Sequence, residues 1–193
     1  MPKSKSVKST SRNDFNQTVD EYTRLRPLYV QYVGKLESLL GDILSSKGIN
    51  YQSIEVRAKT IESFSNKISS KGMIYKNPIK DIFDLAGLRI ILFYQEDVNK
   101  VCSILRSEFK CDLVRSLDKR TELAFDQFGY ISVHMICRLS ADRRKLLEWA
   151  AFKEMVCEIQ VRTVLQHAWA SISHALQYKR ENDIPLIYRR KLV

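Results

Sequence analysis

Three segments of the chain alternate polar and apolar side chains in a way that is typical of β-strands with two different faces. Residues 54–59, 130–135 and 157–162 each place an apolar side chain at every second position. Side chains of a strand point to opposite faces with a period of two, so each segment has one polar face. The polar positions are Glu55, Arg57, Lys59, Tyr130, Ser132, His134, Glu158, Gln160 and Arg162. A half-exposed antiparallel sheet would also alternate, but this mixture of acidic, basic, amide and aromatic groups favours a ligand site.

Four residues around the first of these segments have the chemistry of a phosphate site. Arg57 and Lys59 end the strand pattern, and Ser63 and Lys67 lie four residues apart on one side of the helix expected next. Free N–H groups at a helix N-terminus favour anions, and lysine and arginine add full positive charges. A solvated helix can carry the same charges, so this cluster alone leaves both interpretations open.

Two acidic residues come from different predicted strands. Asp84 directly precedes the apolar segment 85–93, and Glu158 lies on the last strand pattern. Mg²⁺ accepts one or two protein carboxylates together with substrate phosphates, so this pair has the chemistry to hold it. Taken singly, each acid is more often a surface residue or a member of an ion pair.

Hydrophobic periodicity predicts the elements that must position these side chains. An amphipathic helix is expected over residues 13–47, with a kink or break at Pro27. Strands are predicted at 51–59, 85–93, 111–117, 130–139 and 155–162, and helices at 60–71, 96–109 and 163–178. Residues 72–80 and 118–128 are expected to be loops, and 141–152 a basic connection, helical or irregular. This order indicates one α/β (α+β) domain with a mixed sheet of about five strands packed on helices.

The last predicted helix carries an apolar stripe that we interpret as core packing. Its members are Leu165, Ala168, Trp169, Ile172, Ala175 and Leu176. His167 and His174 lie on another side of this helix, and we interpret both as structural residues that form hydrogen bonds. Beyond a core of residues 50–180, residues 184–193 resemble the start of a further helix.

Bulk properties narrow the class of protein. The 193 residues carry a formal charge of +10, which suggests an anionic partner such as nucleotide phosphate or nucleic acid. The basic segment 1–12 is expected to be a disordered tail. No apolar run approaches the ~20 residues that span a bilayer, and no signal peptide is recognisable, so we expect a cytoplasmic protein without a membrane partner. None of the four cysteines forms a Cys-x-x-Cys pair, and Cys137 and Cys157 are expected to be free thiols in the core.

Four sequence blocks in one order resemble a known family. They are DLAGLRII (84–91), GYISVH (129–134), EIQVRT (158–163) and HAWASISHALQYK (167–179), and they resemble the synthetase domain of the RelA/SpoT family, the (p)ppGpp synthetases. The upstream VRAKTIESFSNKI resembles the phosphate motif of that family. The resemblance implies a nucleotidyltransferase-like domain over residues 13–193. It also implies transfer of the pyrophosphate of ATP to the 3′-hydroxyl of GDP or GTP, which makes the alarmone of the stringent response.

The resemblance also implies a role for each matching residue. Arg57, Lys59, Ser63, Lys67 and Arg89 would bind ATP, and Asp84 would ligate Mg²⁺. Glu158 would ligate the metal or act as the base toward the attacking hydroxyl. Tyr130 would stack on the acceptor base, and His134, Gln160 and Lys119 would contact the acceptor. Phe128 and Ile131 stand where long members of the family have Asn and Arg, so the acceptor contacts are expected to differ.

Other functions remain open at this point. The chain resembles the small, single-domain synthetases, because no histidine is followed by Asp as in the hydrolase domain of long members. One alternative resembles the toxic small synthetases, some of which pyrophosphorylate the 3′-CCA end of tRNA, with an antitoxin as a possible partner; synthesis of an adenine alarmone is a further option. A basic track of Arg143, Arg144, Lys145 and Lys153 towards Tyr130 would favour tRNA. A non-catalytic nucleotide or RNA sensor is an alternative of another class, and a homo-oligomer is possible.

Overall fold

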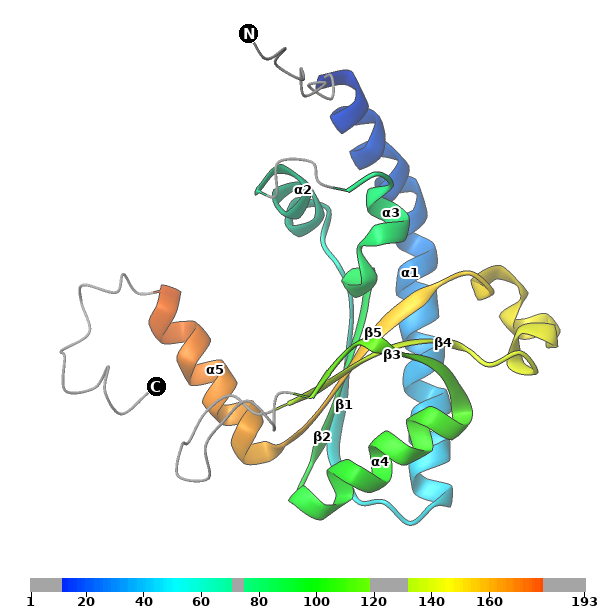
Figure 1. Ribbon diagram of the computed structural model, residues 1–193, viewed down its shortest axis with the longest axis vertical. Coiled ribbons are helices and arrows are strands. Elements are labelled where there is room, and N and C mark those ends of the chain that lie inside the picture. Colours follow the sequence, from blue (N-terminus) through cyan, green and yellow to red (C-terminus); the bar gives the residue numbers. More distant parts are fainter. Residues whose placement is uncertain (1–11, 71–74, 119–131, 179–193) are drawn as a thin grey trace, which may run out of the picture.

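A mixed five-stranded sheet organises the part of the chain that the computed structural model describes, residues 12–70, 75–118 and 132–178 (Figure 1). The strands are β1 (Tyr51–Ala58), β2 (Ala86–Leu92), β3 (Phe109–Asp118), β4 (Val133–Leu139) and β5 (Val156–Thr163). They lie in the order β1-β2-β5-β4-β3. The β2–β5 pair is parallel, whereas the other three described pairs are antiparallel. The predicted mixed sheet is therefore confirmed, and its order brings together strands that are distant in the sequence.

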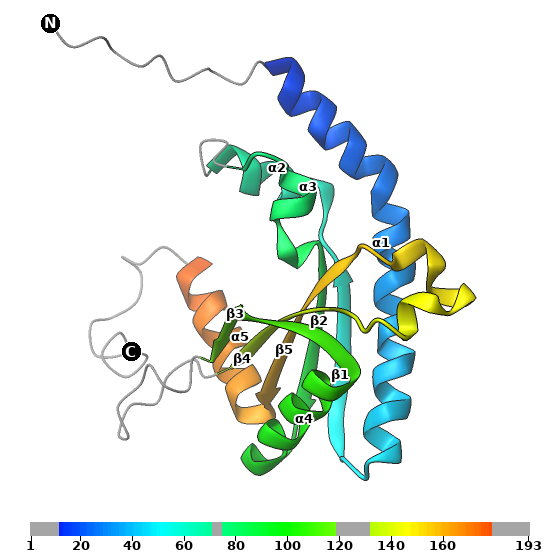
Figure 2. The same ribbon diagram turned by 45° about the vertical axis from the view of Figure 1, so that its right-hand side comes forward.

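One face of the sheet forms the core with two helices. These are α1 (Arg12–Ser46) and α4 (Gln95–Glu108), and both bury their apolar sides in the same cluster as the apolar strand residues. Figure 2 shows α1 running beside β1 on one side of the molecule. Leu88 and Ile159 of the central strands are at most 1% exposed. The period-two alternation thus places the apolar side chains of β2 and β5 under the helices and leaves their polar side chains on the opposite face.

The helix predicted over residues 13–47 is present as α1, and it continues through Pro27 instead of ending there. A proline inside a helix removes one hydrogen bond and costs about 3 kcal/mol. The turns after Pro27 carry Leu36 and Leu40, which are fully buried, and each buried leucine contributes about 1.5–3 kcal/mol. Packing of these turns outweighs the local cost of the proline, so the helix does not break there.

Two short helices, α2 (Ile61–Ser70) and α3 (Pro78–Asp81), lie near the end of the sheet where β1 ends (Figures 1 and 2). Phe64 of α2 is buried and stacks on Tyr22 of α1, with ring centroids 4.3 Å apart. Residues 78–80 were expected to belong to the loop 72–80, and for these residues the expectation is wrong. The Asn77 side chain accepts a hydrogen bond from the Lys80 backbone N–H at 3.2 Å, so the Asn-Pro dipeptide starts a helical turn.

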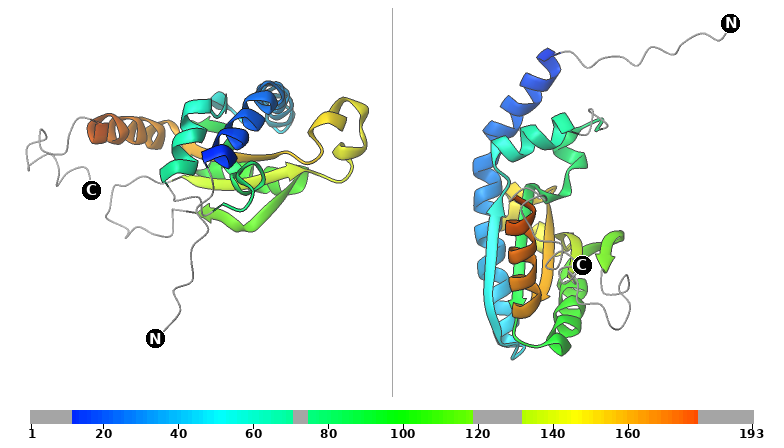
Figure 3. Two further views of the ribbon diagram at one scale, coloured as in Figure 1. Left: turned by 90° about the horizontal axis from the view of Figure 1, so that it is seen from above. Right: turned by 90° about the vertical axis from the view of Figure 1, so that its left-hand side faces the viewer.

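The two ends of the sheet carry different connections. The basic segment 141–152 forms two 3₁₀ helices, η3 (Arg143–Lys145) and η4 (Leu147–Phe152). It lies at the opposite end of the molecule from α5 (Val164–Tyr178), as Figure 3 shows. The apolar stripe of α5 was expected to pack in the core, but Leu165 is 79% and Ile172 is 50% exposed. This prediction is wrong because α5 projects beyond the edge of the sheet, so its apolar side has little strand surface to cover (Figure 1).

Four sequence predictions concern segments outside the described residues, or only partly within them. Outside the described ranges lie the basic tail apart from Arg12, which begins α1, the predicted loop after residue 118 with Lys119, the start of the predicted strand 130–139 with Tyr130, and the start of a helix at 184–193. All four cysteines are free thiols, and Cys137 and Cys157 are fully buried, as expected. Within the described residues, no helix has both the length and the apolar character needed to cross a membrane.

Candidate functional site

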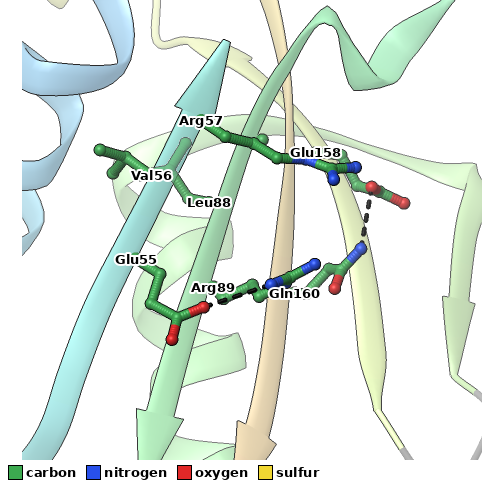
Figure 4. A pocket seen from close by; sticks show the side chains of 8 residues that line it. Glu55, Val56, Arg57, Leu88, Arg89, Glu158 and Gln160 are labelled. Carbon is green, nitrogen blue, oxygen red and sulfur yellow. Dashed lines mark hydrogen bonds and ion pairs between the residues drawn. The ribbon is translucent and has the colours of Figure 1, made fainter. Parts of the chain in front are cut away.

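The polar face of the sheet carries two rows of side chains that cross the strands. In one row, residues opposite one another in neighbouring strands are Glu55 and Arg89, Arg89 and Gln160, and Gln160 and His134. In the neighbouring row, Arg57 lies opposite Gly87, Gly87 opposite Glu158, and Glu158 opposite Ile136. Figure 4 shows Arg57 reaching over β2 towards Glu158, and Arg89 extending towards Gln160. The predicted polar face therefore exists, and register places its charged groups beside one another.

Glu158 lies at the centre of this face and has a partner on each carboxylate oxygen. Its Oε1 is 2.9 Å from Nδ1 of His134, and its Oε2 accepts a hydrogen bond from Nε2 of Gln160 at 3.0 Å. Burial raises the pKa of Glu158, and the charge of Asp84 acts in the same direction. The hydrogen bonds from His134 and Gln160 outweigh these effects and hold the pKa below its ordinary value. Glu158 is therefore an ionised acid in a largely buried position.

Asp84 lies in the 3₁₀ turn η1 (Phe83–Leu85) and forms ion pairs with two lysines. Its Oδ2 is 2.7 Å from Nζ of Lys59, and its Oδ1 is 2.8 Å from Nζ of Lys67. Burial raises the pKa of Asp84, but the hydrogen bonds from Lys59 and Lys67 prevail and lower it. Two cations share one acid, so this cluster keeps an excess of positive charge.

Helix α1 fixes the backbone at this cluster, which sequence reasoning did not anticipate. The Tyr22 hydroxyl donates to the Lys59 carbonyl oxygen at 2.7 Å, and Nε of Arg26 donates to the same oxygen at 3.1 Å. Burial, as the largest cause, raises the pKa of Tyr22 to about 12, so its hydroxyl remains a donor at neutral pH. The four-residue spacing of Tyr22 and Arg26 places both on one side of the helix, and this spacing is the feature of the sequence that could have indicated their shared role.

Two cavities meet at Glu158. One has a volume of about 70 Å³ and is lined by Arg57, Gly87, Arg89, Glu158 and Gln160, among others. The other, of about 310 Å³, is lined by Lys67, Tyr75, Asp84, Ile136 and Glu158, among others. The two predicted acids thus line the same cavity, and the two predicted arginines line its neighbour. Asp84 and Glu158 each have partners of their own, but both acids still line one cavity.

The remaining predicted residues lie at different distances from this centre. Ser63 is exposed at the start of α2, where its hydroxyl accepts a hydrogen bond from Thr60, and it is not among the residues that line either cavity. Tyr130 and Lys119 lie outside the described residues. Glu55 was not predicted as a site residue, yet it pairs with Arg89 at 3.2 Å and lines the smaller cavity. His167 of α5 places Nε2 3.8 Å from Glu55.

The donors around the larger cavity suit a hard divalent cation. Asp84 and Glu158 offer carboxylate oxygens from two elements, and their charges are close enough to affect the pKa of Glu158. Among the described residues, no group of three or more His, Cys, Asp or Glu is placed to hold a metal. Mg²⁺ needs only one or two protein carboxylates when phosphate oxygens and water complete its shell. The two acids therefore fit an ion that arrives with a phosphorylated substrate.

The basic residues considered for a nucleic-acid track are largely paired with acids. Arg143 pairs with Glu108 at 2.5 Å, Arg144 with Glu154 at 2.5 Å, and Lys145 with Asp142 at 2.9 Å. Each pair cancels a charge that a polyanion would otherwise attract. The structure thus gives no support to a basic track built from these three residues.

The pKa of Asp84 leads to a prediction about stability. A carboxyl whose pKa is lower in the folded than in the unfolded state stabilises the fold above its unfolded pKa, and this contribution is lost as pH falls through the folded pKa. We expect Asp84→Asn to lower the melting temperature at pH 7, because Lys59 and Lys67 lose their shared carboxylate. The difference from the wild type should shrink below about pH 4, the ordinary range for Asp. Thermal unfolding of both proteins at several pH values measures this difference in melting temperature. A difference that stays constant down to about pH 3 would contradict the lowered pKa of Asp84.

Comparison with known proteins identifies the family. A model for a region found in RelA / SpoT proteins matches residues 56–183. The curated relatives GTP pyrophosphokinase YwaC and GTP pyrophosphokinase YjbM, both of Bacillus subtilis (strain 168), are each 31% identical to this chain. The matches extend over 131 and 132 residues and cover 67% of this chain in both cases. They correspond to 59% of YwaC and 57% of YjbM, so the chain spans somewhat more than half the length of these relatives.

Solved structures give the same result for the fold. A GTP pyrophosphokinase family protein from Streptococcus pneumoniae superposes with a TM-score of 0.70 at 28% identity, covering 89% of this chain and 84% of that one. The small alarmone synthetase 1 from Bacillus subtilis bound to its product pppGpp superposes with a TM-score of 0.71 at 25% identity, covering 90% and 88%. The residues matched by the family model contain strands β2 to β5, the last three residues of β1, and the residues that line the two cavities apart from Glu55. This chain belongs to the RelA/SpoT family.

Proposed function

We propose that this chain transfers the β,γ-pyrophosphoryl group of ATP to the 3′-hydroxyl of GDP or GTP and so makes (p)ppGpp. The observation that carries the proposal is the arrangement around Glu158. Asp84 and Glu158 line one cavity, and Arg57 and Arg89 line a second cavity that shares Glu158. The relatives named as GTP pyrophosphokinases, and the relative solved with pppGpp, support this choice of acceptor and product.

The cations of the site would bind the donor nucleotide. Arg57 and Arg89 line the smaller cavity, and Lys59 and Lys67 lie together at Asp84. Arginine binds phosphates through a planar set of donors, and lysine supplies a compact charge. Because two lysines share one carboxylate, a phosphate oxygen can become the second acceptor of the cluster without leaving Asp84 unpaired. Ser63 stays a proposed ATP contact on the resemblance alone.

Asp84 and Glu158 would hold Mg²⁺ between them and the phosphates. When bound, the ion would withdraw negative charge from the transferred phosphoryl oxygens. Glu158 would also serve as the general base, because its lowered pKa keeps it ionised and able to accept a proton, and because it lines both cavities.

The proposed chemical step is a single displacement at the β-phosphorus of ATP. Glu158 accepts the proton of the 3′-hydroxyl while that oxygen forms a bond to the β-phosphorus of ATP. The bond from the β-phosphorus to the oxygen it shares with the α-phosphate breaks, and AMP leaves with that oxygen. Tyr130 and Lys119 would bind the acceptor, as the family resemblance implies.

A labelling experiment tests this function. The chain is incubated with Mg²⁺ and γ-labelled ATP together with GDP, GTP, AMP or deacylated tRNA, and the products are separated. We expect label on GDP or GTP, with AMP formed in equal amount. Label on tRNA, with a steep loss at higher salt, would support the tRNA alternative instead. Label on no acceptor would contradict the enzyme assignment.

A further inference from the structure

His134 lies in a chain of hydrogen bonds that ends on Glu158. His134 of β4 lies directly opposite Gln160 of β5, and Glu158 is two residues earlier on the same face of β5. The Nδ1 atom of His134 is 2.9 Å from Oε1 of Glu158, and its Nε2 atom is 2.6 Å from the hydroxyl oxygen of Ser132. Ser132 is only 1% exposed, and the side chains of His134 and Glu158 are 15% and 19% exposed. These hydrogen bonds are therefore largely shielded from water.

The direction of each hydrogen bond follows from the chemistry of the groups at the ends. An ionised carboxylate only accepts, so Nδ1 of His134 must carry a proton and donate to Glu158. In the neutral imidazole, Nε2 then accepts, and the Ser132 hydroxyl donates to it. On the other side, the amide N–H of Gln160 donates to Oε2 of Glu158, while its carbonyl oxygen accepts from the Arg162 guanidinium. A flipped Gln160 amide would place its oxygen against the carboxylate, and two hydrogen-bond acceptors repel each other.

This arrangement restricts the rotation of the Glu158 carboxylate. One hydrogen bond on each oxygen fixes the plane of the group, and each oxygen keeps a lone pair for another contact. Reacting groups must be held within roughly 10–20° of the productive geometry, and a shift of about 1 Å can cost about 10²-fold in rate. Both ring nitrogens of His134 are already engaged by Ser132 and Glu158, which leaves the ring poorly suited to read an acceptor nucleotide.

We propose that His134, held by Ser132, is a positioning residue that orients the Glu158 carboxylate for the attacking hydroxyl. This inference rests on the proposed function, and it assigns His134 a role different from the acceptor contact that the family resemblance implies. The substrate does not need to touch His134 for this role. Loss of the ring should therefore slow the chemical step and leave acceptor affinity nearly unchanged.

Two amide substitutions separate the two nitrogens of the ring. His134→Asn keeps an N–H donor near the position of Nδ1, within reach of Glu158, whereas His134→Gln places its amide near Nε2. We expect His134→Ala to lower kcat by about 10²-fold, with KM for GTP changed less than about threefold. His134→Asn should recover at least tenfold of that loss and His134→Gln should not. Ser132→Ala should lower kcat in the same direction by a smaller factor.

Binding and stability measurements complete the test. GTP affinity, measured by calorimetry in the absence of ATP, should stay within about threefold of the wild type in all four variants, and thermal unfolding identifies any variant that does not fold. A rise in KM and in the GTP dissociation constant with kcat retained would overturn the inference and return His134 to the acceptor site. Equal kcat values for the Asn and Gln variants would also overturn it. A wild-type chain that labels no acceptor would instead refute the proposed function itself.

Discussion

Glu158→Gln is expected to lower kcat by about 10³-fold, within the range that general-base catalysis contributes. The amide cannot accept the proton of the attacking hydroxyl, and the change removes one of the two carboxylates proposed to hold Mg²⁺. The shape of the side chain is kept, so the His134 contact can form to the amide oxygen. The amide N–H₂ would meet the N–H₂ of Gln160, so a small drop in melting temperature is expected as well. Steady-state rates with saturating ATP and GTP measure the effect.

A matched control for this change is Glu154→Gln. Glu154 is 80% exposed, pairs with Arg144, and lines neither of the two cavities. It undergoes the same chemical substitution, so kcat should remain within about twofold of the wild type, as for surface substitutions in general. Full activity of Glu158→Gln would show that Glu158 is neither a base nor a metal ligand.

Asp84→Asn is expected to lower kcat/KM for ATP by about 10³-fold, because several kcal/mol of charge stabilisation would be lost and each 1.36 kcal/mol is tenfold. The variant loses one of the two acids proposed to hold Mg²⁺. It also leaves Lys59, whose side chain is 9% exposed, without its carboxylate partner. Titration of the rate against Mg²⁺ separates these effects, since loss of a metal ligand shifts the midpoint to higher Mg²⁺.

The corresponding control is Asp142→Asn. Asp142 pairs with Lys145, and its side chain is 91% exposed. Its replacement should leave both the rate and the Mg²⁺ midpoint unchanged within about twofold. If Asp84→Asn lowers stability but keeps the wild-type rate at the permissive temperature, Asp84 is a partner of the lysines and not part of the reaction site.

The predictions that succeeded are those that depend on local periodicity. Alternation at residues 54–59 and 157–162 predicted strands with a polar face, and both strands are present with that face. Helix 96–109 is present within one residue at each end, as α4. Steric rules and side-chain direction act over a few residues, so the sequence carries this information directly.

The apolar stripe of α5 shows where periodicity stops being informative. The spacing of Leu165, Trp169 and Ile172 correctly indicates a helix with one apolar side. Whether such a side is covered depends on which elements lie next to it, and α5 extends past the sheet edge. The same limit applies to Pro27, where burial of later turns outweighs a local preference.

The sequence by itself determined the kinds of groups available, namely cations, two acids and polar strand faces, because these follow from residue identity and period. It also determined the family, through blocks whose order and spacing are specific. Only the tertiary structure decided which groups meet. The order β1-β2-β5-β4-β3 places Arg89 beside both Glu55 and Gln160 and sets His134 against Glu158, across 24 residues of chain. Such pairings depend on strand register and on long-range packing, where one residue of slip would move every side chain to the other face.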